Sequence, residues 1–316
     1  LVWAPEREAE ETFVAVQLRR SDGFTDEGGA NRRGSISGAV IGQLALVGPG
    51  DLRGRIFVAA HAARAGIAGV VRQDDIDAGR VDLYGTYNNP SATAQSTLTS
   101  RALAALELEL LRPTGDRSAL LLWAGQVDFR SRINNTGFVQ RAVSNPAWVG
   151  RGDLIEQSNQ DSSVGALWTH RTKWMRGASG RRVQLEVGAE VRRNGIDQTQ
   201  NLLQQPQNQT WDRRVDATVR ATDLGAYADA DLRLGPRWRI RGGGRAELLA
   251  YDVDDRLGNF TSSFQKASHL PGFRRTSQGV AAGPRLALEF KPASDWALHL
   301  AYGEGFRSPQ ARQLEE

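Results

Sequence analysis

Residues 285–302 read RLALEFKPASDWALHLAY, and this stretch decides how the rest of the chain is interpreted. Its large apolar side chains occupy every second position on both sides of a short turn. They are Leu286, Leu288, Phe290, Trp296, Leu298, Leu300 and Tyr302. Arg285, Glu289 and His299 occupy the intervening positions. Because successive side chains of a β-strand point to opposite faces, the stretch predicts a hairpin with one apolar and one polar face.

The same alternation recurs along the chain. In 181–193, valine, leucine and alanine alternate with arginine, glutamine and glutamate. In 237–245, four arginines share one face opposite Trp238 and Ile240. In 119–130, the apolar set Leu121, Trp123, Val127 and Phe129 is interpreted as opposing Gln126, Asp128 and Arg130. A polar interior and an apolar exterior fit these faces. Slipping such a strand by one residue would turn arginines to lipid, at roughly 2–4 kcal/mol each near the bilayer midplane.

Short turns and long polar stretches alternate between the expected strands. The short turns lie at 48–51, 113–116, 177–180, 235–236 and 292–295, and the long stretches lie at about 20–34, 64–97, 131–161, 194–213 and 252–277. Hairpins with short turns at one end and long loops at the other are typical of outer-membrane barrels. The pattern predicts an all-β, antiparallel up-and-down transmembrane β-barrel with short periplasmic turns and long extracellular loops.

About eleven strands are expected. They are 12–20, 35–47, 53–64, 98–111, 118–131, 162–175, 181–193, 214–234, 237–251, 278–291 and 295–304. Bacterial single-chain barrels have even strand numbers, so 1–316 is interpreted as a partial barrel, about half of a large one.

Three segments need a further assumption. Residues 101–112 contain strong helix formers, but the alternation of leucine and glutamate favours a strand. In 214–234 the apolar parity switches, which predicts a bulge near Asp223 and Leu224. The glycines at 242–244 predict a bend or a close backbone approach.

Composition agrees with this fold and excludes several functions. The 316 residues have a mean hydropathy of −0.45 and no apolar run long enough for a helical span. The net charge is +4, but arginine is scattered among acidic residues and only Lys173, Lys266 and Lys291 are lysines, so nucleic-acid binding is not expected.

Catalysis is not expected either. The four histidines lack the spacing of metal ligands, and no hydrolase or metalloprotease motif is present. The carboxylates at 74, 75 and 77 and at 252, 254 and 255 are interpreted as solvated loop charge rather than a cation site. No enzyme activity, cofactor or metal is therefore predicted.

The end of the chain carries a family resemblance. The segment 301–309, AYGEGFRSP, resembles the "Y-G-x-G-F-R-x-P" segment in the barrel of TonB-dependent outer-membrane receptors, through Gly303, Gly305, Phe306, Arg307 and Pro309. The hairpins at 224–245 and 283–302 and the segment 128–138 are similar to the same family.

The resemblance implies TonB-dependent active uptake of a scarce nutrient, such as a ferric siderophore, across the outer membrane of a Gram-negative bacterium. Its partners would be the TonB–ExbB–ExbD complex, acting through a plug domain, and the surrounding outer-membrane lipid and lipopolysaccharide. No plug domain, TonB box or final aromatic strand is recognised in 1–316, so the fragment is expected to be inactive alone.

Ligand recognition is expected in the long loops, where aromatic, arginine and amide side chains supply stacking area and hydrogen bonds. The candidates are Tyr84, Tyr87, Phe138, Arg141, Trp148, Trp211, Phe260, Phe264 and His269. Each could instead pack its own loop or lie in an interfacial aromatic girdle.

Two other functions stay open from the sequence. A passive porin-like channel would have the same alternating faces but no plug domain. A soluble β-rich adhesin or carbohydrate-binding protein would bury its apolar faces against each other, with Trp238, Leu286 and Leu298 inside the protein.

Overall fold

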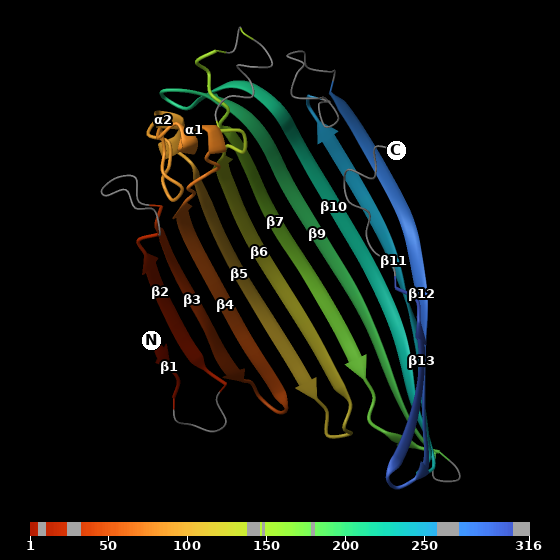
Figure 1. Ribbon diagram of the computed structural model, residues 1–316. Coiled ribbons are helices and arrows are strands. Elements are labelled where there is room, and N and C mark those ends of the chain that lie inside the picture. The colour runs from red at the N-terminus through yellow and green to blue at the C-terminus, as the bar shows by residue number, and fades with distance from the viewer. Residues whose placement is uncertain are drawn as a thin grey trace.

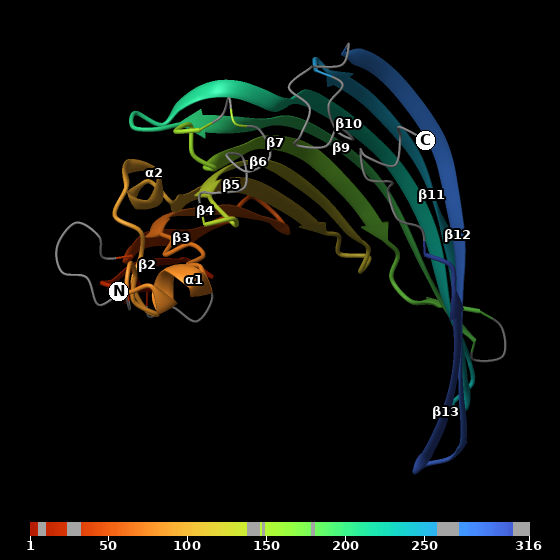
Figure 2. The same cartoon turned by 45° about the horizontal axis from the view of Figure 1, so that its top comes forward.

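The computed structural model describes residues 1–5, 11–23, 33–137, 146, 149–177, 181–257 and 272–305. These residues form one strongly curved antiparallel sheet (Figure 1), whose concave side faces the two short helices (Figure 2). Thirteen strands are present in this described part, in the order β1 to β7 and β9 to β13, with β8 paired to β9 alone. The sheet is open, and its edge strands are β1 and β13.

Most strands are long enough to cross a membrane. In chain order the elements are β1 (Val2–Trp3), β2 (Phe13–Ser21), β3 (Ser35–Val47), β4 (Leu52–Gly66), α1 (Gln73–Asp77), α2 (Pro90–Thr93), β5 (Ser96–Leu111), β6 (Arg117–Ile133), β7 (Ile155–Arg171), β8 (Met175–Arg176), β9 (Arg182–Gln204), β10 (Gln209–Leu234), β11 (Trp238–Asp255), β12 (Phe273–Ala293) and β13 (Trp296–Gly303). No helix in the described ranges has the length and apolarity needed to cross a membrane.

The predicted strands are confirmed. Each of the eleven expected ranges overlaps one of β2 to β7 and β9 to β13, although 162–175 runs past the end of β7 at Arg171. The two additional strands, β1 and β8, are two residues long. Residues 101–111 belong to β5, so leucine–glutamate alternation prevails over helix propensity there. The short turns lie together at one end of the sheet and the long connections at the other (Figure 1).

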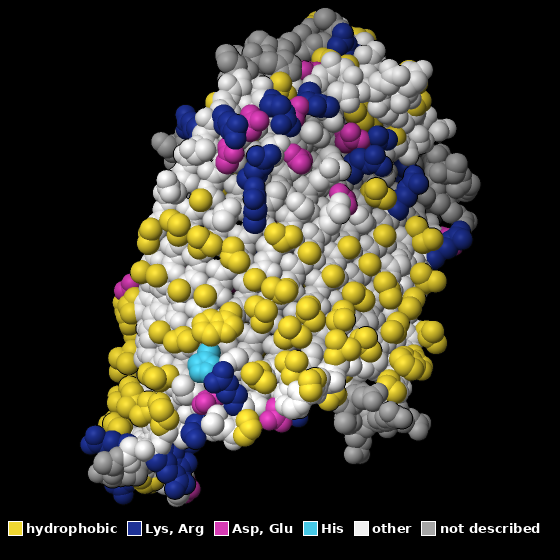
Figure 3. Space-filling model, turned by 180° about the vertical axis from the view of Figure 1, so that it is seen from behind, with side chains coloured by type: hydrophobic (Ala, Val, Ile, Leu, Met, Phe, Trp, Pro, Cys, Tyr) yellow, Lys and Arg dark blue, Asp and Glu magenta, His cyan; other side chains and the backbone are white. Residues whose placement is uncertain are grey.

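The convex face carries a belt of apolar side chains. Cross-strand pairing aligns Leu122 with Ala166, Ala166 with Val191, and Val191 with Leu224. Seen from behind, the apolar side chains form a band with charged residues above and below it (Figure 3). Leu286 and Leu298 are 52% and 55% exposed, which is unfavourable in water and suits contact with lipid.

Aromatic rings lie on this face at the short-turn end. Trp238 stacks on Phe290 with ring centroids 4.1 Å apart, and Trp168 stacks on His170 at 6.4 Å. Aromatic side chains favour the membrane–water interface because one part of the ring is apolar and the other can be hydrated. These rings therefore form part of an interfacial girdle.

The prediction of a long loop at 194–213 is wrong. β9 continues to Gln204 and β10 begins at Gln209, so only a tight turn separates them. The expected loops at 131–161 and 252–277 are also shortened, because β7 begins at Ile155 and β12 at Phe273. Outside the bilayer both faces of a strand meet water, so its composition is as polar as that of a loop.

The prediction of a bulge near Asp223 and Leu224 is also wrong. β10 pairs with β11 in unbroken register from Ala217 to Leu234, and its register shifts against β9 lie instead between Thr210 and Asp212 and between Arg213 and Val215. The apolar parity switches because Ala217, Val219 and Ala221 occupy the concave face, where they are buried. Ala221 packs there with Leu249 and Tyr251.

The face assignment in 119–130 is a third correction. The belt positions of β6 are Leu120, Leu122 and Ala124, so Leu121, Trp123, Val127 and Phe129 lie on the concave face. Residues 119–124 are apolar at every position, so alternation could not distinguish the faces. The Trp123 ring covers Gly165 of β7, where a Cβ would overlap the ring.

Tyr227 makes a similar contact. Its ring lies over Gly188 of β9, its cross-strand neighbour, and its hydroxyl donates a 3.0 Å hydrogen bond to Glu186 Oε1. Gly243 shows the close approach expected for the glycines at 242–244, because Asp229 occupies the space of the missing side chain. Glycine thus allows large or charged side chains to lie flat on the concave face.

Gly188→Val is expected to destabilise the sheet by about 1–3 kcal/mol, because the new side chain would overlap the Tyr227 ring. The measurement is the urea midpoint of unfolding in detergent micelles, followed by tryptophan fluorescence. Gly279→Val is the matched control, because nothing lies within 4 Å of a Cβ at that position. Equal unfolding midpoints for the two variants would contradict the close packing of the Tyr227 ring over Gly188.

Val187→Arg is expected to destabilise the membrane-inserted protein by about 2–4 kcal/mol, because Val187 lies on the belt and would carry its charge into lipid. Gln184→Arg is the control, since position 184 lies on the concave face opposite Asp231. The free energy of unfolding from vesicles measures both. A larger loss for Gln184→Arg would show that the faces are reversed.

Candidate functional site: the concave wall and its loops

The concave face carries alternating acidic and arginine side chains. Arg285 Nε donates to Asp229 Oδ1 at 2.6 Å across two strands. Asp231 accepts from Arg239 Nε at 2.9 Å and from Arg241 Nε at 3.1 Å. These bonds are formed because every second residue of β10, β11 and β12 points to this face.

Arg245 links β11 to β9 across the intervening strand β10 of the same wall. Its guanidinium bonds Glu190 of β9 at 2.9 Å and also pairs with Glu247 of β11. The guanidinium passes Gly225 of β10, where a Cβ would lie 3.3 Å from Nη2. On β9 to β12 the wall is therefore polar and carries several paired charges, which allows it to face water or another polar protein surface.

Two recesses lie on the concave face toward the short-turn end. One has a volume of about 560 Å³ and is lined by Arg171, Glu186, Asp229, Asp231 and Tyr302 among others. The second, of about 660 Å³, is strongly basic and is lined by Arg182, Arg233, Arg237, Arg239 and Lys291 with Glu289. Both can accept polar or anionic groups from whatever occupies the concave side.

Amide side chains line the concave face nearer the long loops. Gln157 of β7 is paired with Gln200 of β9, and Asn159 with Gln198. Asn159 Oδ1 is buried and has no hydrogen-bond partner among the residues that the structure describes. The Asn159 oxygen is enclosed by protein, so the hydrogen-bonding groups that the patch offers to a polar ligand are those of Gln157 and Gln200.

The connection between β4 and β5 folds into a compact platform. Arg33, which is buried, donates to Thr86 Oγ1 at 3.0 Å and to the carbonyl oxygens of Ala92 at 2.9 Å and Thr93 at 3.1 Å. Asn89 caps α2 by accepting a 2.8 Å bond from the Ala92 N–H. This platform lies at the long-loop end, on the concave side of β3 to β5 (Figures 1 and 2).

Asp75 is the electrostatic centre of the platform. Its carboxylate accepts from the Tyr87 hydroxyl at 2.6 Å and from Arg80 Nη1 at 2.7 Å. The Tyr87 oxygen in turn accepts a 3.1 Å bond from the Arg72 N–H. The Tyr87 hydrogen bond, followed by that of Arg80, holds the pKa of Asp75 below its usual value. Burial and the Asp75 carboxylate raise the pKa of Tyr87.

Among the predicted ligand residues, Tyr84 is available for binding. It is exposed on the platform and makes no hydrogen bond within the described residues. Tyr87 is hydrogen-bonded to Asp75 and to the Arg72 N–H, so it packs its own loop instead of being available to a ligand. Trp211 lies on β10 rather than in a loop, with Arg151 Cζ 4.4 Å from its ring centroid. Phe138, Arg141, Trp148, Phe260, Phe264 and His269 lie outside the described residues.

The remaining predicted positions are placed as follows. Gly303 ends β13 and Gly305 follows it, whereas Phe306, Arg307 and Pro309 lie outside the described residues. In the two carboxylate groups, Asp75 binds Arg80 and Tyr87, and Asp252 binds Arg274 at 2.7 Å. Within the described ranges no cluster of three His, Cys, Asp or Glu residues could hold a metal ion.

Sequence reasoning missed the concave-face network and the amide patch. Arg241 and Arg245 were assigned to the polar face, but Asp231 and Glu190, with which they pair, lie on other strands. The sequence did carry a signal for Gln198 and Gln200. The strand pattern continues past residue 193, with amide and hydroxyl side chains in place of apolar and charged ones. It was not recognised because neither face is apolar there.

The described residues form a segment of an outer-membrane-type barrel. The features that define it are long antiparallel strands, an apolar belt, an aromatic girdle and a polar concave wall. The sequence comparison agrees with this class. Residues 47–316 match the family described as TonB dependent receptor-like, beta-barrel. The chain belongs to this family, whose members are outer-membrane transporters and not enzymes. No curated protein sequence matches the chain.

Solved structures show the same fold. The ferric citrate transporter FecA superposes with a TM-score of 0.68 at 13% identity, over 92% of this chain and 38% of FecA. The siderophore receptor PiuA from Acinetobacter baumannii gives 0.64 at 12% identity, over 92% of this chain and 44% of PiuA. The ferric yersiniabactin uptake receptor FyuA from Yersinia pestis gives 0.62 at 14%, over 93% and 42%. The chain therefore spans less than half the length of each.

Tyr87→Phe is expected to loosen the platform above about pH 4 and to make it less sensitive to acid. The lowered pKa of Asp75 contributes stability that is present above its unfolded value of about 4 and is lost as pH falls through the lower folded value. Without the Tyr87 hydroxyl the folded pKa rises toward the unfolded one, so the variant has less of this stability above about pH 4 and converges with the unmodified protein as pH falls. Hydrogen exchange of residues 67–95 between pH 3 and 6 measures this.

The control for this experiment is Tyr84→Phe. It removes a hydroxyl from the same platform without removing a hydrogen bond described in the structure. Its exchange profile is expected to follow the unmodified protein. If both variants shift equally, the Tyr87–Asp75 bond does not determine the acid response.

Proposed function

We propose that the chain is part of the barrel wall of an outer-membrane receptor that imports a scarce nutrient, such as a ferric siderophore, by TonB-dependent active transport. The observation that carries the proposal is the division of one sheet into two surfaces. A continuous apolar belt lies on the convex face and a charge-paired wall on the concave face. The first suits lipid, and the second suits a polar content such as a plug domain or a hydrated ligand.

The related structures support the substrate class. FecA carries ferric citrate, PiuA is a siderophore receptor and FyuA takes up ferric yersiniabactin. The chain covers less than half of each, so 1–316 would be a partial barrel domain that acts only as part of a complete receptor. Energy would reach it from the TonB–ExbB–ExbD complex through a plug domain.

Binding is assigned to the long-loop end. Exposed Tyr84 and the amides of Gln157 and Gln200 offer a flat apolar ring and hydrogen-bonding groups around one opening of the concave side. Such a combination suits a bulky polar ligand, because stacking contributes contact area and amides contribute direction. The two recesses at the opposite end would contact the plug domain rather than the incoming ligand.

The alternatives are less well supported. A soluble adhesin or carbohydrate-binding protein would bury the belt, whereas Trp238, Leu286 and Leu298 are all exposed. A porin-like channel would have the same faces, but the family match favours a gated receptor. Outer-membrane lipid and lipopolysaccharide are the expected surroundings of the belt in the Gram-negative cell.

The test is ferric-siderophore uptake by the complete receptor in a strain without other siderophore receptors. Uptake of radioactive iron is expected with at least one siderophore of a panel, and it is expected to stop when tonB is deleted or the proton gradient is dissipated. Uptake that persists without TonB would favour the passive channel. Failure to transport any member of a broad panel of iron, cobalamin and glycan ligands would refute the proposal.

Tyr84→Ala is expected to weaken ligand binding by about 1–2 kcal/mol, which is roughly 5- to 30-fold in Kd, if Tyr84 stacks on the ligand. Binding to whole cells at 4 °C separates affinity from transport. Leu83→Ala is the control, because Leu83 is an equally exposed neighbour without a hydroxyl or a ring. Unchanged affinity in Tyr84→Ala would remove this residue from the binding site.

A further inference from the structure

Four arginines form a cluster on the convex face at the long-loop edge of the belt. Arg20 lies on β2, Arg64 on β4, and Arg130 and Arg132 on β6. Cross-strand pairing runs from Arg20 to Ile36, Arg64, Leu98 and Arg130 in turn, so these side chains share one face and one height. We call Arg20, Arg64, Arg130 and Arg132 the boundary arginines.

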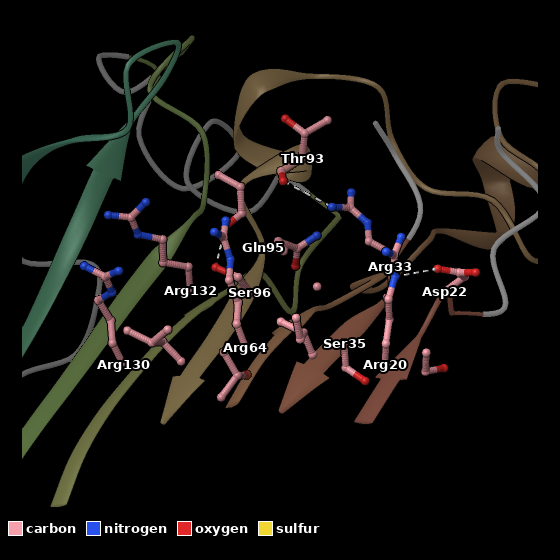
Figure 4. Close-up of a pocket in the computed structure, with 17 residues that line it drawn as sticks. Arg20, Asp22, Arg33, Ser35, Arg64, Thr93, Gln95, Ser96, Arg130 and Arg132 are labelled. Atoms are coloured by element: carbon pink, nitrogen blue, oxygen red, sulfur yellow. Dashed lines mark hydrogen bonds and ion pairs between the residues drawn. The ribbon is translucent and has the colours of Figure 1, made fainter. Parts of the chain in front are cut away.

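The boundary arginines surround a recess of about 880 Å³ (Figure 4). Ile36 and Leu98 contribute apolar surface to it and are 61% and 42% exposed. Thr93, the last residue of α2, and Gln95, which follows the helix, supply part of its polar edge. Buried Arg33 fixes the α2 segment there through the carbonyl oxygens of Ala92 and Thr93. The recess thus combines cationic and apolar surface on an ordered frame.

The cluster has more positive than negative charge. Arg20 Nε lies 3.3 Å from Asp22 Oδ1, and Arg132 Nε lies 2.7 Å from Glu156 Oε2. Arg64 and Arg130 have neither a hydrogen bond nor a carboxylate partner within the described residues. With adjacent strands about 4.8 Å apart, their backbones are separated by only about 10 Å. Like charges held at this distance create a site for an anion.

The other side of the same rim is different. On β10 to β12, Arg213 and Arg256 both pair with Asp216, and Arg274 pairs with Asp252. Those convex-face arginines are compensated by carboxylates in the protein. These three arginines therefore differ from Arg64 and Arg130, for which the described residues supply no carboxylate partner.

We propose that the boundary arginines bind the phosphate groups of a phosphorylated lipid headgroup in the outer leaflet. The proposal rests on the proposed function only for the assignment of the convex face to lipid. Guanidinium groups match phosphate oxygens geometrically, and basic clusters beside a membrane attract anionic headgroups. Ile36 and Leu98 favour a lipid over a soluble anion, because acyl chains continue from the phosphates onto the belt directly below.

The test measures lipid retention by the complete receptor with Arg64→Gln and Arg130→Gln combined. Purified protein is incubated with bisphosphorylated lipid A, with the same lipid after enzymatic removal of both phosphates, or with inorganic phosphate, and native mass spectrometry counts the bound molecules. The unmodified receptor is expected to retain bisphosphorylated lipid A alone. The double variant is expected to bind it about tenfold or more weakly, because each basic group near the surface contributes about fivefold.

Arg274→Gln is the matched control, because Arg274 is an exposed convex-face arginine above the belt whose charge Asp252 compensates. It is expected to retain the lipid. Heat-modifiable migration on gels confirms that each variant is folded, and the two single variants replace the double one if it does not fold.

Three results would overturn the proposal: equal retention by the double variant and the unmodified receptor, equal retention of the dephosphorylated lipid, or displacement of the lipid by an equal concentration of inorganic phosphate. TonB-dependent uptake is measured separately on the same variants. Loss of lipid binding with uptake intact, or the reverse, therefore distinguishes a failure of this proposal from a failure of the proposed function.

Discussion

Backbone hydrogen bonding without water is the constraint on which the rest of this structure depends. A strand in a bilayer must satisfy its N–H and C=O groups by pairing with neighbouring strands, since lipid offers no partner. The ladder from β2 to β13 meets this requirement with long antiparallel pairs and short turns. Once the ladder is formed, side-chain alternation assigns every residue to lipid or to the concave side.

The concave side has a second requirement, which is to pair many of the charged side chains that it carries. Arginines reach carboxylates on other strands, and Arg245 reaches Glu190 by passing over a glycine. Glycines at 188 and 165 allow Tyr227 and Trp123 to lie flat against the sheet. The result is a polar wall whose strands are connected by side-chain contacts as well as by the backbone ladder.

Sequence alternation predicted the fold well wherever one face meets lipid and the other meets water. The hairpin at 285–302 and the strand at 181–193 were assigned correctly for this reason. It failed at 119–124, where both faces are apolar, and at 194–213, where both faces are polar. It also misplaced a bulge in β10, because Ala217 and Val219 are buried on the concave face instead of facing lipid.

The candidate site was less predictable than the fold. Tyr84 and Tyr87 look alike in sequence, yet one is exposed and the other is bonded to Asp75. The sequence by itself determined the all-β class, the strand order and most of the apolar belt, because alternation is a local property of a strand. Only the tertiary structure decided which charges meet, such as Arg285 with Asp229, 56 residues apart. The physical reason is that cross-strand neighbours are selected by the register of the whole ladder, and a charge has no partner until that ladder is complete.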